Sequence, residues 1–379
     1  MSESTAALPL VSVMIPAYNA AKTLAASIDS ALAQRYPRVE VVVVDDGSTD
    51  ATPDVLRSYG DRIRWVRQEN GGLPSARNLG HRTATGDFIA WLDADDLAEP
   101  DRVALQVDFL LQHPEVVLVG TDFSAFRDAG DVAPRFSAIY YNQIADAENG
   151  VDSLYDRRGS FVPARHEWLQ GTWGSIPMLR GKVWSRIVWG NFVHPPTVMF
   201  RRGLLERTGG LDPSAAPEGD WDFFIRVSKE GEIAHLDHPF LRYRLHPGQM
   251  SGPTNAKASL LGQVYILRKA HSPSASWPDR LRELWRERHA LLYAGLARAE
   301  AQQNSWAALG YLSLAAAHRH PPRSLIPIFI LILLPVWASR GLLAARRVMR
   351  RWMKPQAVHH TIVVAAYALQ QAEWVPLLI

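Results

Sequence analysis

The first 120 residues alternate short apolar runs with amphipathic stretches, and this alternation strongly limits the folds open to the chain. Runs rich in β-branched residues predict strands at residues 11–15, 39–44, 63–66, 88–92 and 116–119. Helical periodicity predicts helices at residues 23–34, 52–59, 74–84 and 100–112. Because helices separate consecutive apolar strands, we expect an α/β fold with a mostly parallel sheet covered on both faces.

Polar clusters follow four of the predicted strands, at the point where each strand ends. They are residues 16–19, 45–48, 70–72 and 93–96. The carboxyl ends of parallel strands open onto the same edge of a sheet. The sequence therefore predicts one crevice in which these four clusters meet.

Asp93 and Asp95 come directly after a buried strand, at a spacing that lets both carboxylates approach one cation. Magnesium and manganese prefer oxygen ligands and bind one or two carboxylates while substrate phosphates complete the octahedron. The same residues also fit a turn before a helix near Pro100, with Asp96 or Glu99 as the cap. The sequence is therefore compatible with a metal site and with a structural turn at these residues.

Asp45 and Asp46 form a second carboxylate pair at a strand end. Ser48, Thr49 or Asp50 can cap the helix that follows, which leaves Asp46 free to accept from a base or a ribose. A carboxylate can accept the ring N–H of uracil or thymine, which gives a specificity that an apolar slot lacks.

Five segments resemble family 2 glycosyltransferases of the GT-A fold: VSVMIPAYN, VEVVVVDDGSTD, NGGLPSARNLG, GDFIAWLDADD and PEGDWDFFIRVSKEG. They span Val11 to Gly231 in the family's order. The resemblance implies a GT-A-type sheet flanked by helices, here with a C-terminal helical extension. It also implies inverting transfer of a sugar from a nucleotide-diphosphate sugar donor to an acceptor hydroxyl, with Mg²⁺ or Mn²⁺ as cofactor.

The resemblance further implies roles for individual residues. Tyr18 would lie by the base, Asp46 would contact the base, and Asp95 would bind the metal. The positions implied to bind the nucleotide sugar are Pro16, Ala17, Tyr18, Asp46, Arg77, Asp93 and Ala94.

An inverting transfer needs a base that deprotonates the acceptor hydroxyl. The family places an aspartate of a Glu-Asp pair there, and the matching pair in this sequence is Gly219 and Asp220. Asp220 is therefore the expected base, although its glutamate partner is replaced by glycine. Asp222 or Glu218 are alternatives, and Asp220 also fits a simple cap of a helix over residues 221–229.

His246 lies in the segment LRYRLHPGQMS, which also resembles the family, and a metal-ligand role and a structural role are both open. Arg242 and Arg244 could clamp a diphosphate or lie in solvent. The aromatic segment 189–197 could form an acceptor-side wall or pack in the core.

The C-terminal part of the sequence differs in composition from the part before it. Residues 325–338 form a charge-free apolar run of 14 residues, whereas a spanning helix needs about 20. Residues 321–354 hold seven Arg and Lys and no acidic residue, which predicts a basic amphipathic helix on an anionic membrane surface, with a buried helix as the alternative. The predicted units are a nucleotide-sugar-binding half at 1–120, an acceptor-binding and catalytic half at 121–251, a helical extension at 252–320 and a membrane-associating tail at 321–379.

Composition narrows the classes of function. The chain has no cysteine, which excludes a disulfide framework, a thiolate metal site and a cysteine nucleophile. The net charge of +3 consists of +7 in residues 321–354 and −4 in the rest of the chain, and a mildly acidic body does not fit general nucleic-acid binding. The N-terminus lacks signal-peptide features, so we expect a cytoplasmic protein, peripheral on the inner face of the membrane.

Two other functions compete with sugar transfer. A sugar nucleotidyltransferase would want a glycine-rich basic loop after the first strand, which residues 16–19 are not. A non-catalytic nucleotide-binding scaffold at a membrane surface is favoured only by Gly219. For an active enzyme the expected acceptor is a glycan or a lipid-linked acceptor, in cell-surface polysaccharide or glycolipid synthesis.

Overall fold

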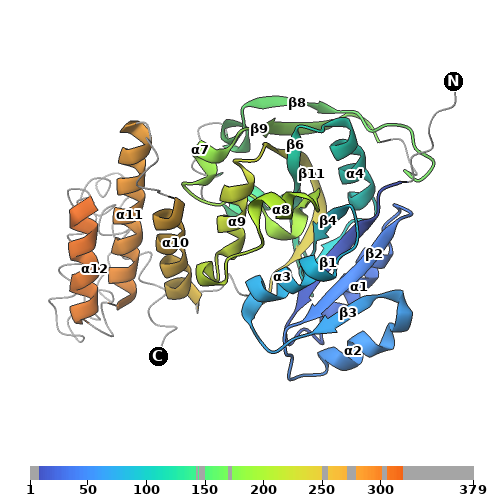
Figure 1. Cartoon of the computed structure of the whole chain (residues 1–379), viewed down its shortest axis with the longest axis horizontal. Coiled ribbons are helices and arrows are strands. Elements are labelled where there is room, and N and C mark those ends of the chain that lie inside the picture. Colours follow the sequence, from blue (N-terminus) through green and yellow to red (C-terminus); the bar gives the residue numbers. More distant parts are fainter. Residues whose placement is uncertain are drawn as a thin grey trace, which may run out of the picture. The chain divides into compact units, whose positions relative to one another are not determined.

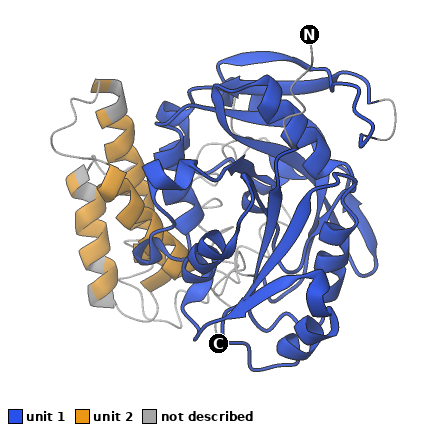
Figure 2. Cartoon of the chain, turned by 45° about the vertical axis from the view of Figure 1, so that its right-hand side comes forward, with its two compact units in different colours: residues 1–249 blue, residues 250–379 orange. Residues whose placement is uncertain are grey.

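The computed structural model describes residues 8–141, 144, 150–169, 173–249, 255–270, 279–300 and 305–318. The chain divides into two compact units, residues 1–249 and residues 250–379, which Figure 2 colours separately. The described strands all belong to the first unit, and the second unit is described through three helices.

Four parallel strands form the N-terminal half of the sheet, in the spatial order β3-β2-β1-β4 (Figure 1). They are β1 (Val11–Ala17), β2 (Val39–Asp45), β3 (Arg64–Arg67) and β4 (Phe88–Trp91). Every residue of β1 is buried, so both faces of the sheet are covered at its centre. The predicted α/β fold with a mostly parallel, helix-flanked sheet is confirmed.

The C-terminal half of the sheet mixes strand directions. β10 (Met199–Arg201) lies antiparallel between β4 and β6 (Val116–Arg127), and β6 runs parallel to β11 (Glu232–Arg244). β9 (Ile176–Gly181) and β8 (Arg157–Phe161) add an antiparallel edge. Two short strands, β5 (Leu97–Ala98) and β7 (Gly130–Ala133), pair with β11 and β6. The sequence did not predict β10, because three residues are too few to show a strand period.

Helices of the first unit connect and cover these strands. They are α1 (Leu24–Leu32), α2 (Thr52–Ser58), α3 (Gly72–Thr83), α4 (Arg102–Gln112), α5 (Ser137–Tyr140), α7 (Trp184–Ile187), α8 (Leu204–Thr208) and α9 (Gly219–Val227). α3 and α9 share one face of the sheet, because the buried Trp91 of β4 packs against His81 of α3 and Phe223 of α9. A Cβ at Gly80 would lie 2.6 Å from Met14, so glycine lets α3 approach β1 closely.

The second unit contains α10 (Ala256–Ala270), α11 (Asp279–Glu300) and α12 (Ser305–His318). Among the helices described here, none has the length and apolar character needed to cross a bilayer. The basic, apolar tail at 321–379, for which membrane contact is predicted, lies outside the described residues.

Candidate functional site

The loops after β1 and β2 are bonded to each other at the carboxyl edge of the sheet. Asn19 adopts φ 50°, a conformation that asparagine tolerates better than most residues. Its N–H donates to Ser48 Oγ at 2.9 Å, and its side-chain oxygen accepts from the Thr49 N–H at 2.8 Å. Pro16 and Ala17 are buried, whereas Tyr18 is 51% exposed, so its ring has a free face for stacking.

Asp46 is held by the start of α3. Its Oδ1 accepts from Gly71 N–H at 2.9 Å and from Gln68 Nε2 at 2.6 Å, and its Oδ2 accepts from Gly72 N–H at 2.8 Å. The expectation that Asp46 has no structural partner is wrong, because Asp46 caps a helix that is distant in sequence while Asp50 bonds the Thr52 N–H of α2. A carboxylate has about four acceptor positions. Oδ2 therefore accepts one hydrogen bond fewer than Oδ1, and Asp46 as a whole is 3% exposed.

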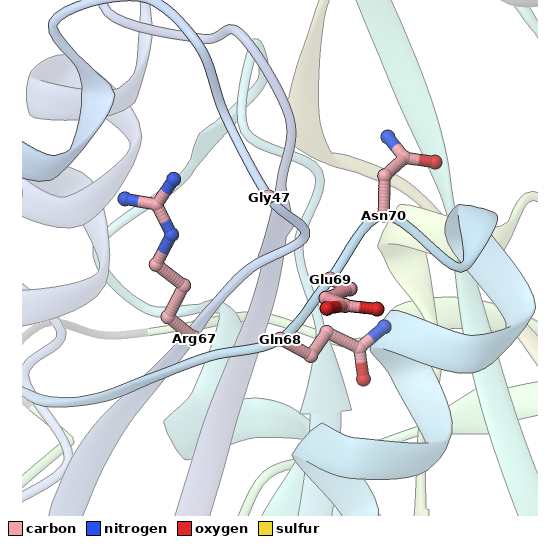
Figure 3. A pocket seen from close by; sticks show the side chains of 5 residues that line it. All are labelled: Gly47, Arg67, Gln68, Glu69 and Asn70. Atoms are coloured by element: carbon pink, nitrogen blue, oxygen red, sulfur yellow. The ribbon is translucent and has the colours of Figure 1, made fainter.

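An open pocket of about 550 Å³ borders this loop, lined by Gly47, Arg67, Gln68, Glu69 and Asn70. Figure 3 shows the 67–70 segment running beside Gly47, with the Arg67 side chain directed away from those of Gln68 and Asn70. Gly47 adopts φ 77°, and a Cβ there would lie 2.7 Å from the backbone nitrogen of Asn70. Glycine is thus needed for both the conformation and the close approach.

Replacing Gly47 with alanine should push the 68–72 segment away from Asp46. Hydrogen bonds to charged groups contribute about 1.5–3 kcal/mol each, so the nucleotide binding that the resemblance implies should weaken by about 10-fold or more. Titration calorimetry with UDP measures this. Gly60→Ala is the matched control: φ is 52°, and no atom in the described part of the chain lies within 4 Å of its Cβ position. Equal affinities for the two variants would contradict the expectation.

The acidic loop after β4 faces the end of β11. Asp95 Oδ2 lies 3.0 Å from His246 Nε2, and the two side chains are 32% and 36% exposed. Burial, followed by the neighbouring charge of Asp93, raises the pKa of Asp95, and the hydrogen bond from His246 opposes this rise. The structure thus brings together Asp95 and His246, the two residues named as possible metal ligands.

Asp96 has a structural position. It is fully buried and its Oδ1 accepts from the Arg244 N–H at 3.0 Å, and burial raises its pKa well above the ordinary value. The alternative that Asp96 caps the next helix is wrong, because its carboxylate fixes the loop to β11 instead.

The fit of a divalent metal rests on Asp95 and His246. Within the described ranges there is no group of three or more His, Asp or Glu side chains that could hold an ion. Two protein ligands suffice for Mg²⁺ or Mn²⁺ when phosphates and waters complete the octahedron. A carboxylate whose negative charge is disfavoured by burial and by Asp93 is also one that a cation would stabilise. The residues present therefore fit a metal–diphosphate site.

Arg77 is buried beneath this loop, with 1% of its surface exposed. Its guanidinium donates to Asp93 Oδ1 at 2.9 Å and stacks on Trp91, with 4.4 Å between the guanidinium carbon and the ring centre. The guanidinium is thus engaged by Asp93 and Trp91, and the nucleotide contact that the resemblance implies for Arg77 stays a prediction. Ala94, the next residue in the loop, is half-buried.

Asp220 lies in the first turn of α9 and is half-buried. Burial raises the pKa of Asp220, while the positive charge of Arg77 lowers it and the charge of Asp93 raises it further. The charges of Arg77 and Asp93 thus act on Asp220, although it comes from a distant part of the chain. A raised pKa suits a carboxylate that must take up a proton.

The two alternatives to Asp220 differ in their surroundings. Asp222 is 3% exposed and accepts from Arg226 at 2.8 Å, so it serves an ion pair within α9. Glu218 is half-buried at the N-cap of α9, and its charge, like that of Asp220, helps to raise the pKa of the Tyr141 hydroxyl, for which burial is the main cause. Glu218 therefore lies near the candidate base.

Gly219 packs α9 tightly against α3. A Cβ at this position would lie 3.1 Å from Pro74 Cγ and 3.5 Å from the Asp212 carbonyl oxygen. The replacement of the usual glutamate is thus accompanied by close helix packing beside Asp220.

The remaining predicted residues are engaged in the protein. Arg242 pairs with Asp131 at 2.8 Å, and Arg244 donates to the Asp95 carbonyl at 2.9 Å and to Asp128 at 2.6 Å. Of the segment 189–197, residues 192–197 are buried, which favours core packing over an acceptor wall.

Sequence reasoning missed several residues that organise the site: Gln68, Tyr243 and Gln249. Gln68 lies two residues before Asn70 of the Asn70-Gly71-Gly72 cluster, which gave a weak signal for it. The Pro-Gly dipeptide after His246 is a turn signal that could have pointed to Gln249.

Known proteins with similar sequences are named as glycosyltransferases. The chain is 45% identical over 248 residues to an uncharacterized glycosyltransferase of Rickettsia felis, covering 64% of this chain and 35% of that protein. It is 44% identical over 242 residues to one of Rickettsia typhi, covering 64% of this chain and 65% of that protein. The chain thus spans between about a third and two-thirds of the length of these relatives.

A solved structure shares the fold. It is a mannosyltransferase from Pyrobaculum calidifontis in complex with GDP-Man and Mn²⁺, with a TM-score of 0.53 and 21% identity over 97% of this chain and 85% of that one. The model of glycosyl transferase family 2 matches residues 12–207, more than half of the chain. The match agrees with the order of the strands in the sheet and with the loops at one edge of it. The chain belongs to glycosyl transferase family 2.

Proposed function

We propose that the chain is a metal-dependent, inverting glycosyltransferase that moves a sugar from a nucleotide diphosphate to an acceptor hydroxyl. The observation that carries the proposal is the contact between the acidic loop after β4 and the histidine after β11, 151 residues apart in sequence. Asp95 lies 3.0 Å from His246, and Arg77 bonds Asp93 while its charge reaches Asp220. In this proposal residues 1–120 bind the donor and residues 121–251 bind the acceptor.

Each residue has a separate task in the reaction. Tyr18 stacks on the base, Asp46 accepts a ring N–H, and Asp93, fixed by Arg77, holds the ribose side. Asp95 and His246 would hold the Mg²⁺ or Mn²⁺, which stabilises the charge of the departing diphosphate.

The transfer itself needs one proton acceptor. Asp220 takes the proton of the acceptor hydroxyl as its oxygen forms the new bond to the anomeric carbon. The bond from that carbon to the diphosphate oxygen breaks at the opposite face, so the configuration inverts. A carboxylate with a raised pKa holds this proton more readily than an ordinary one.

The competing functions have weaker support. Family membership and the 16–19 loop, which lacks a glycine-rich basic sequence, both disfavour a sugar nucleotidyltransferase. The non-catalytic scaffold relied on Gly219, and the tight contact with Pro74 gives that glycine a packing reason.

The acceptor and the location are proposed from sequence. We place the acceptor hydroxyl on a glycan or a lipid-linked sugar, at the inner face of the membrane. This part rests on the basic composition of residues 321–354.

A donor screen tests the proposed function. UDP-, dTDP- and GDP-sugars are incubated with the protein and Mn²⁺, with and without EDTA, and the release of nucleoside diphosphate is measured. Metal-dependent release from one class of donor is the expected result. If nucleotides bind and no donor is consumed under any condition, the scaffold function is supported instead.

The hydrogen bonds of Asp46 predict which base the donor carries. Uracil and thymine offer one ring N–H, which the remaining position on Oδ2 can accept. Guanine offers an N–H and an adjacent amino group, and an unpaired buried donor costs about 1–3 kcal/mol. We expect UDP or dTDP to bind about 10-fold or more tightly than GDP in calorimetric titrations with Mn²⁺. If GDP binds more tightly than UDP and dTDP, this count of acceptor positions on Asp46 is contradicted.

A further inference from the structure

The residues after β11 form a closed turn that carries the metal-side histidine. The Gln249 N–H donates to the His246 carbonyl at 3.3 Å, and proline and glycine occupy the two central positions. This is the hydrogen-bond pattern of a β-turn. The side chain of Gln249 folds back onto the same turn: its Oε1 accepts from the His246 N–H at 3.2 Å.

The other end of the Gln249 side chain is tied to the core. Its Nε2 donates to the Tyr243 hydroxyl at 2.6 Å. Tyr243 is 8% exposed, and its ring packs edge-on against His194, Tyr140 and Phe123, with centres 5.0, 5.5 and 5.7 Å away. Tyr243 is therefore a fixed point to which Gln249 connects the turn.

The opposite side of the turn meets the acidic loop. Besides the contact between His246 and Asp95, Arg244 binds the Asp95 carbonyl at 2.9 Å through its Nε and the Asp96 carboxylate at 3.0 Å through its N–H. Together with the Leu245 N–H, which donates to the Phe126 carbonyl at 2.8 Å, these contacts fix the backbone up to Leu245. The His246 ring, which is 36% exposed, is held by Asp95 on one side, while its backbone is held by the turn.

We propose that Gln249 is a positioning residue that holds His246 in its metal-binding orientation by linking it to Tyr243. This inference rests on the proposed function. A metal ligand that is oriented beforehand loses less conformational freedom on binding. Mutation of groups that orient metal ligands typically costs about 10–100-fold in metal affinity.

The test measures metal binding without turnover. Mn²⁺ is titrated by electron paramagnetic resonance in the presence of saturating UDP, or of GDP if the donor screen selects it. We expect Gln249→Ala to bind Mn²⁺ about 10–100-fold more weakly than wild type. Tyr243→Phe removes only the anchoring hydroxyl and should weaken Mn²⁺ binding in the same direction. The double variant should lose little more than Gln249→Ala alone, because both changes break one connection.

Kinetics and matched controls separate positioning from general damage. Gln249→Ala should need more Mn²⁺ for half-maximal rate while kcat at saturating Mn²⁺ stays near that of wild type. Gln112→Ala removes an amide of α4 that donates to Asp108, and Tyr59→Phe removes a hydroxyl at the end of α2 that bonds Asp29. These two variants should bind Mn²⁺ as wild type does.

Two results would overturn the inference, and only the second of them would also contradict the metal dependence of the proposed function. If wild type binds Mn²⁺ and both Gln249→Ala and Tyr243→Phe bind it equally well, Gln249 does not position His246 and the proposed function is untouched. If wild type with any nucleotide fails to bind Mn²⁺, metal dependence itself is wrong and the role of Gln249 falls with it.

Discussion

Asp220→Asn is expected to lower kcat for sugar transfer by about 10²–10⁴-fold, the usual contribution of a general base. The amide keeps the size of the side chain and an oxygen that can accept from the Trp221 N–H, so α9 should be preserved. It cannot take up the proton of the acceptor hydroxyl. Steady-state transfer assays, together with calorimetric titration of the donor, should show lost turnover with unchanged donor affinity.

The pH dependence tests the same group. Burial raises the pKa of Asp220, so the carboxylate becomes protonated at a higher pH than an ordinary aspartate. The kcat of wild type should therefore fall as pH decreases through this raised pKa, and the residual activity of Asp220→Asn should lack that limb. Glu218→Gln is the comparison variant, because Glu218 lies nearby and belongs to the same helix start. If Glu218→Gln loses activity and Asp220→Asn keeps it, Glu218 is the base.

Asp95→Ala is expected to lower turnover by roughly 10³-fold, because a metal that stabilises a leaving diphosphate contributes several kcal/mol to the transition state. Asp95 and His246 are the two side chains that would hold the ion, so loss of the carboxylate leaves one protein ligand. Donor turnover and Mn²⁺ binding are both measured, and both should fall together.

A nearby acidic residue provides the control for this change. Asp128 is an exposed carboxylate that pairs with Arg244, so Asp128→Ala removes a similar negative charge near the same loop. Exposed ion pairs contribute only about 0–1 kcal/mol, and Asp128→Ala should keep Mn²⁺ binding and turnover close to wild type. If Asp95→Ala keeps full activity, measured either with Mn²⁺ or with EDTA, the assignment of Asp95 as a metal ligand is wrong.

The N-terminal half of the fold could be predicted closely from local patterns. The helix predicted at 100–112 is α4, Arg102–Gln112, and the strand predicted at 39–44 is β2, Val39–Asp45. Buried parallel strands are continuous apolar runs, and their helices show a clear 3.6-residue period, so both are visible in sequence. β10 could not be predicted in this way, because its place between β4 and β6 depends on pairing with residues about 80 to 110 positions away.

The residue types of the candidate site were also visible in sequence, whereas several of their partners were not. Asp46, Asp95, His246 and Asp220 were chosen from motifs, and the structure brings Asp95 and His246 together. The helix cap that occupies Asp46 and the burial of Arg77 on Trp91 were not foreseen. Each depends on contacts between segments that are far apart in sequence, and a local sequence pattern does not reveal such contacts.

The sequence by itself determined the alternation of strands and helices, the end of each strand at which polar residues gather, and the family. Those properties follow from periodicity and from the order of short motifs along the chain. The tertiary structure alone decided that Asp46 bonds the start of α3, that the buried Arg77 pairs with Asp93, and that Gln249 joins His246 to Tyr243. Hydrogen bonds and burial depend on the distance between side chains in space, which sequence spacing does not fix.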